Sequence, residues 1–113
     1  MRLHIIEDDP AVSDALATVL GELGHDIACY PDAESFLAVP PPVKDDLVIV
    51  DLGLPGISGD EVVRRLRERD EPPRIIVISG RSKSALQRTF PDSSSLTVLR
   101  KPLSFPVLAE HLD

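Results

Sequence analysis

Residues 47–59 read LVIVDLGLPGISG. The first four are apolar at every position, which is typical of a strand that is buried on both faces at the centre of a parallel sheet. This run ends on Asp51, and a loop that contains glycine and proline follows it. The stretch therefore predicts a central strand that delivers a carboxylate to the edge of the sheet where parallel strands end.

Similar apolar runs lie on both sides of this stretch and alternate with stretches of helical spacing. The predicted strands span residues 3–6, 26–30, 47–50, 75–78 and 96–99. Asp9, Asp32 and Ser104 are expected to cap helices, and a further helix is expected over about 59–69. Alternation of this kind predicts the α/β class, with a doubly wound parallel sheet and helices on both faces. Residues 82–95 are expected to form only a short or mobile helix.

Composition limits the classes to which the protein can belong. At 113 residues, with 42% hydrophobic and 27% charged residues, we expect one domain over residues 1–113. A net charge of −7 argues against direct binding to nucleic acid. The longest strongly apolar run, Leu47 to Val50, is too short to span a membrane. The lone Cys29, which we expect to be a small buried side chain, and the lack of a signal peptide favour a cytoplasmic protein.

Polar side chains stand where four of the predicted strands end. Glu7 and Asp8 follow the first strand and Asp51 the third, while Ser79 ends the fourth and Lys101 follows the fifth. Ligands of open parallel α/β sheets bind beyond the carboxyl ends of the strands. We therefore expect three carboxylates, a hydroxyl and an ammonium group to meet at one edge of the sheet.

This set of residues indicates metal-assisted phosphoryl chemistry. Carboxylates about 4 Å apart repel by ~4 kcal/mol at an effective dielectric constant near 20, so three of them require a proton or a cation. Oxygen ligands without His or Cys favour Mg²⁺, with Mn²⁺ or Ca²⁺ as substitutes. The predicted role of Asp51 is to accept a phosphoryl group, while Lys101 and Ser79 contact the oxygens of that group.

Four segments resemble the receiver domains of bacterial two-component response regulators. They are IIEDDP at 5–10, VIVDLGLPGISG at 48–59, IVISG at 76–80 and LRKP at 99–102. The resemblance implies a flavodoxin-like sheet with strand order 2-1-3-4-5 and a cis peptide bond before Pro102.

The resemblance also implies roles for the residues of the site and a partner. A metal would be held by Glu7, Asp8, Asp51 and the backbone carbonyl of Gly53. A histidine kinase or a phosphotransfer protein would donate the phosphoryl group to Asp51, which makes the protein a switch rather than a turnover enzyme. A second copy of the chain, in a homodimer, is a further candidate partner.

Departures from the family pattern keep two alternatives open. Val98 stands where the family usually has a Tyr or Phe that reports phosphorylation, so the domain could instead serve constitutive dimerisation or docking. An aspartyl-phosphate phosphohydrolase is disfavoured, because Gly53 stands where a second acid would follow Asp51. Arg81, two residues after Ser79, is a candidate for the mouth of the site, where it would alter the access of water.

Overall fold

The computed structural model describes residues 1–91 and 96–112. Its centre is a five-stranded parallel sheet in the order β2-β1-β3-β4-β5, which confirms the predicted fold class and strand order. The strands are β1 (Arg2–Ile6), β2 (Asp26–Tyr30), β3 (Leu47–Asp51), β4 (Arg74–Ser79) and β5 (Thr97–Arg100).

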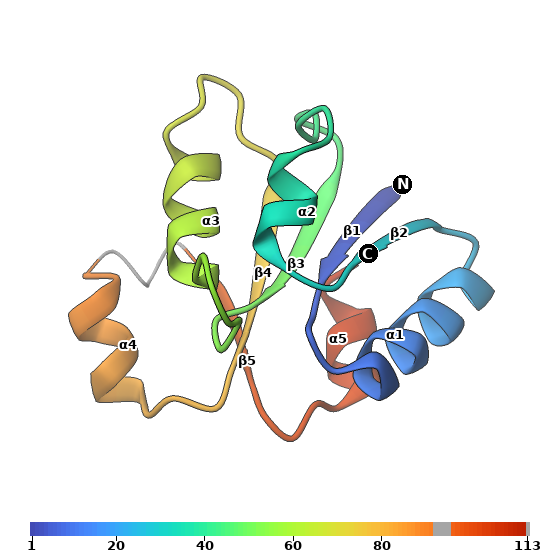
Figure 1. The fold of residues 1–113 in the computed structure, drawn as a ribbon. Coiled ribbons are helices and arrows are strands. Elements are labelled where there is room, and N and C mark those ends of the chain that lie inside the picture. The colour runs from blue at the N-terminus through green and yellow to red at the C-terminus, as the bar shows by residue number, and fades with distance from the viewer. Residues whose placement is uncertain (92–95, 113) are drawn as a thin grey trace.

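Helices cover both faces of this sheet (Figure 1). One face carries α1 (Pro10–Glu22) and α5 (Phe105–Glu110), and the other carries α2 (Ala33–Leu37), α3 (Gly59–Arg67) and α4 (Lys83–Thr89). With seven residues, α4 is short, as predicted for residues 82–95; residues 92–95 of that stretch lie outside the described residues. None of the helices in the described part is both long and apolar enough to cross a bilayer.

Local sequence signals fix where the helices begin and end. The Asp9 side chain accepts a hydrogen bond from the Ala11 amide and caps α1, whose first residue is Pro10. Asp32 and Ser104 cap α2 and α5 in the same way, so the three predicted caps are confirmed. Each cap satisfies an amide that has no partner inside its helix.

The side chains of the strands build a core on each face of the sheet. All five residues of β3 are buried, which agrees with its central position in the sheet. Leu47 and Ile49 pack beneath α1 and α5, whereas Val48 and Val50 pack beneath α2 and α3. This alternation fixes the register of β3 and leaves Asp51 at its end.

The prediction that Cys29 is buried is wrong. Cys29 is exposed, although it pairs with Ile5, which is fully buried. The difference arises because β2 is an edge strand, so a side chain there lacks the second neighbouring strand that surrounds Ile5. The third helix also ends at Arg67 rather than near Arg69.

A buried polar pair ties β1 to the turn before β3. His4 is 4% exposed, and its Nε2 atom lies 3.0 Å from Asp46 Oδ2, which also accepts a hydrogen bond from the Val43 amide. Burial raises the pKa of the Asp46 carboxyl, but the hydrogen bonds from His4 and Val43 outweigh burial, and the pKa lies below its ordinary value of 3.8. The ionised carboxylate therefore stabilises the fold above that pH, and this contribution is lost as the pH falls through the lowered pKa.

We expect Asp46→Asn to lower the free energy of unfolding at pH 7 by about 1–2 kcal/mol. The difference from the unmodified protein should shrink from pH 7 to a pH below the lowered pKa of Asp46, because the carboxyl is then protonated in both states of the unmodified protein. Urea denaturation across this pH range measures it, with Asp45→Asn as the control because Asp45 is exposed. A difference that is the same at both pH values would contradict the assignment.

Candidate functional site

The carboxyl ends of four strands bring the predicted polar residues to one edge of the sheet. Ile6 of β1 pairs with Val50 of β3, so Glu7 and Asp8 emerge beside Asp51. Ser79 of β4 pairs with Arg100 of β5, and the Lys101 amide donates to the Ser79 carbonyl at 3.0 Å. The register of the sheet therefore sets the positions of all these residues.

Asp51 lies at the centre of this edge and is only 3% exposed. Its Oδ2 atom lies 3.0 Å from Lys101 Nζ, and its Oδ1 atom accepts a hydrogen bond from the Gly53 amide at 2.9 Å. Burial lowers the pKa of the Lys101 ammonium group, but the bond to Asp51 and the charges of the neighbouring carboxylates outweigh burial and raise it. Lys101 is therefore a permanent positive charge against the Asp51 carboxylate.

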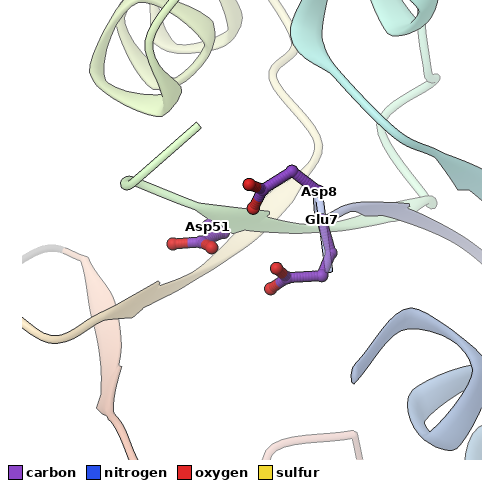
Figure 2. A group of neighbouring side chains, drawn as sticks. All are labelled: Glu7, Asp8 and Asp51. Atoms are coloured by element: carbon purple, nitrogen blue, oxygen red, sulfur yellow. The ribbon is translucent and has the colours of Figure 1, made fainter. Parts of the chain in front are cut away.

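Glu7 and Asp8 complete an acidic cluster with Asp51 (Figure 2). One oxygen from each of the three carboxylates lies within 4.8 Å of the others. The figure shows the three side chains reaching from the ends of β1 and β3 toward a common region. Glu7 and Asp51 are buried and Asp8 is exposed, so the cluster opens to solvent on the side of Asp8.

The buried carboxyl of Glu7 provides a test of whether the cluster fits a cation. Its Oε1 atom accepts a hydrogen bond from the Asp9 amide at 3.1 Å, whereas Oε2 is buried and has no partner among the described residues. Burial and then the nearby charge of Asp51 raise the pKa of Glu7 to about 7, although the Asp9 amide opposes them. A divalent cation would supply the missing partner and remove the repulsion, so the residues present fit a hard metal ion.

The Ser79 hydroxyl faces the loop that joins β4 to α4. Ser79 is 1% exposed, and its Oγ atom accepts a hydrogen bond from the Arg81 amide at 2.9 Å. The Arg81 guanidinium forms an ion pair with Asp60 and contacts the carbonyl of Leu52, the residue after Asp51. Arg81 is therefore at the site, where the sequence suggested it.

The loop from Asp51 to α3 is anchored at two further points. Glu34 of α2 accepts a hydrogen bond from the Ile57 amide at 3.3 Å, and its carboxylate fills the space that a Cβ atom on Gly56 would need. Gly56 has a φ of 71°, a conformation that favours glycine. Gly59, at the start of α3, packs so closely on Asp51 and Leu52 that no side chain fits there.

The sequence did not reveal two of these contacts. It gave no sign of the Glu34 contact with Ile57 or of the pairing of Asp60 with Arg81. An acid in the first turn of a helix is favoured whatever faces it, so Asp60 alone carried no signal of a partner. These contacts join residues that are 23 and 21 positions apart, and they depend on how the helices pack.

Two features of the resemblance can be compared directly with the structure. The peptide bond between Lys101 and Pro102 is cis, as implied. Val98 is half-buried, and it lines a cavity of about 280 Å³ between α4 and β5 together with Leu86 and Leu96. The position at which the family usually has an aromatic ring therefore carries a small side chain next to unfilled space.

The fold and the acidic edge define an α/β domain of the kind that carries a carboxylate at the end of its third strand. The family model described as the response regulator receiver domain matches residues 3–113. The chain belongs to this family, whose members act in two-component signal transduction.

Named relatives and solved structures agree with this assignment. The two-component response regulator PhoP of Pseudomonas aeruginosa is 38% identical over 81 residues, which are 72% of this chain and 36% of PhoP. The positive alginate biosynthesis regulatory protein of the same species is 32% identical over 99% of this chain and 46% of its own length. The chain therefore spans less than half the length of these relatives.

A solved structure of similar extent is that of the response regulator TrrA from Thermotoga maritima, in complex with Mg²⁺ and BeF. It has a TM-score of 0.79 and 27% identity to this chain, and the match covers 98% of this chain and 95% of TrrA.

Proposed function

We propose that this chain is a phosphoacceptor domain in which Asp51 receives a phosphoryl group with the help of Mg²⁺. The observation that carries the proposal is the setting of the Asp51 carboxylate, which contacts the Lys101 ammonium group and lies within 4.8 Å of the carboxylates of Glu7 and Asp8. Buried carboxylates that share one cation and face solvent on one side suit metal-assisted phosphoryl transfer.

The donor we propose is a phosphohistidine of a histidine kinase or of a phosphotransfer protein. The N–P bond of the donor breaks with its electron pair on the imidazole nitrogen, and one Asp51 oxygen forms the new O–P bond. Lys101 offsets negative charge on the phosphoryl oxygens, and the Ser79 hydroxyl donates a hydrogen bond to one of them.

Glu7, Asp8, Asp51 and the Gly53 carbonyl would hold the metal, with Mn²⁺ or Ca²⁺ as substitutes for Mg²⁺. When bound, the metal supplies neutralisation of charge on the phosphoryl oxygens. Burial of Asp51 and Glu7 strengthens all of these interactions, because little water screens them.

The direct test is incubation with acetyl phosphate and Mg²⁺, followed by intact mass spectrometry. We expect the protein to gain one phosphoryl group, and we expect Asp51→Asn to gain none, because an amide nitrogen replaces the oxygen that attacks phosphorus. Asp26→Asn is a matched control, since Asp26 is exposed and is the first residue of β2, whereas the site lies where the strands end. Equal uptake by Asp51→Asn would reject Asp51 as the acceptor.

The same experiment separates the alternatives. Failure of the unmodified protein to gain a phosphoryl group would favour a docking or dimerisation domain, for which Val98 and its adjacent cavity are the supporting features. Repeated hydrolysis of a phosphomonoester would favour a phosphohydrolase. The structure offers such an enzyme no acid at position 53, where only the Gly53 amide faces Asp51.

The role in the cell that follows from this proposal is that of a switch. A phosphoryl group adds about −1.5 to −2 charges to the edge of the sheet and changes the surface that a partner meets. We infer from the acidic net charge of −7 that any nucleic acid target is reached through another domain or protein.

A further inference from the structure

Arg81 connects three parts of the site by its backbone and side chain. Its amide donates to Ser79 Oγ at 2.9 Å, and its Nη2 atom lies 3.4 Å from the Leu52 carbonyl oxygen. Its Nη1 atom lies 2.8 Å from Asp60 Oδ2. The guanidinium group therefore stands beside the residue that follows Asp51, and one carboxylate holds it there.

Asp60 is placed to hold Arg81 loosely. It lies in the first turn of α3, directly after Gly59, which packs against Asp51. Its Oδ2 atom contacts Arg81, whereas its Oδ1 atom is buried and has no partner among the residues that the structure describes. The side chains of Arg81 and Asp60 are 33% and 27% exposed, so solvent reaches the pair and screens it in part. Asp60 holds the guanidinium group through one oxygen only, so an anion with more charge and more acceptor oxygens can compete for it.

We propose that Arg81 is a phosphoryl-binding residue that Asp60 restrains until Asp51 is phosphorylated. The inference rests on the proposed function and adds a regulatory pair to that site. A phosphoryl group carries more negative charge than one carboxylate and offers three acceptor oxygens, so it competes with Asp60 for the guanidinium group. The planar fork of arginine suits phosphate oxygens better than a single carboxylate oxygen. Asp60 is then a positioning residue, which acts on the acyl phosphate only through Arg81.

The ion pair of Arg81 and Asp60 also links the site to α3. When the guanidinium group moves to the phosphoryl group, Asp60 loses its partner at the start of α3. The signal would then reach α3 through a change of ion pairing. Such a route needs no aromatic ring on β5, where this chain has Val98.

Binding of beryllium fluoride in the presence of Mg²⁺ tests the proposal, because this anion mimics a phosphoryl group on a carboxylate. Titration calorimetry gives the affinity. We expect Asp60→Asn to tighten binding about three-fold, because it frees the guanidinium group. We expect Arg81→Gln to weaken binding about five-fold, because it removes a charged hydrogen-bond donor. In the double variant, the affinity should equal that of Arg81→Gln alone.

Glu61→Gln is the matched control for Asp60→Asn. It removes the same charge from the same turn of α3, but Glu61 pairs with Arg64 and Arg65 on the surface of the helix. Any general effect of charge on anion binding should appear equally in both variants. The proposal is overturned if Asp60→Asn behaves like Glu61→Gln, or if its effect persists in the Arg81→Gln background.

A second readout follows the guanidinium group directly. The Arg81 Nε–H resonance in ¹⁵N-resolved spectra should shift when beryllium fluoride is added to the unmodified protein, and it should lie closer to the bound position in Asp60→Asn before addition. No shift on saturation would reject the proposal. Failure of the proposed function looks different: the unmodified protein would then bind no beryllium fluoride, or would bind it as well as Asp51→Asn does.

Discussion

Lys101→Met should tighten the binding of Mg²⁺ about ten-fold while it slows phosphorylation by acetyl phosphate about 100-fold. The opposite signs have one cause. The Lys101 ammonium group lies 3.0 Å from Asp51 Oδ2, so it repels a metal ion that approaches the same carboxylate and attracts an incoming phosphoryl group. The Lys101 side chain is 41% exposed, but that of Asp51 is only 4% exposed. Solvent therefore screens the Asp51 carboxylate weakly.

Calorimetric titration with Mg²⁺ and a time course of intact mass measure the two effects. Lys44→Met is the control, because it removes the same charge from an exposed loop residue. A parallel loss of metal binding and phosphorylation would mean that Lys101 only supports the local structure. Unchanged values for both would remove Lys101 from the site.

The largest effect on stability is expected from Gly59→Ala, which should lower the free energy of unfolding by about 3 kcal/mol. A Cβ atom at this position would lie 2.7 Å from Leu52 Cα and closer still to the Asp51 carbonyl oxygen. Both neighbours are backbone atoms, one in the last residue of β3 and one in the residue after it, so no change of rotamer can relieve the overlap. The start of α3 must therefore move away from Asp51.

Gly80→Ala is the matched control, because a Cβ atom there would meet no atom within 4 Å and Gly80 lacks a positive φ. We expect its stability to rise by at most about 1 kcal/mol. Thermal denaturation should show a midpoint roughly 10–15 °C lower for Gly59→Ala. Equal midpoints for the two variants would show that α3 can shift freely and that its contact with Asp51 is not tight.

The elements of the fold could be predicted because each has a local physical cause. The apolar run at residues 47–50 is buried on both faces only in the middle of a sheet that helices cover. The capping Asp and Ser residues mark the starts of helices in the sequence itself. The strand order is different, since it came from the resemblance and not from periodicity. The extent of strands was underestimated where hydrogen bonding continues into polar residues, as at Arg74 and Ser79 in β4.

The candidate site was predictable only in part. The general rule for parallel sheets identifies the residues at the strand ends, and the structure brings Glu7, Asp8, Asp51 and Lys101 together. The rule does not say which of two adjacent acids is buried, and the structure shows that Glu7 is buried and Asp8 is exposed. The contacts of Asp60 and Glu34 depend on helix placement, which no local pattern encodes.

The carboxylate of Glu34 beside Gly56 has a consequence for how these two positions can evolve. Any side chain at position 56 would have to displace that carboxylate as well as adopt a φ of 71°. A residue shorter than glutamate at position 34 would vacate the space but give up the bond to Ile57. Shortening residue 34 would relieve only the overlap at position 56, and the strain of the positive φ would remain, so glycine stays the favoured residue there whatever stands at position 34.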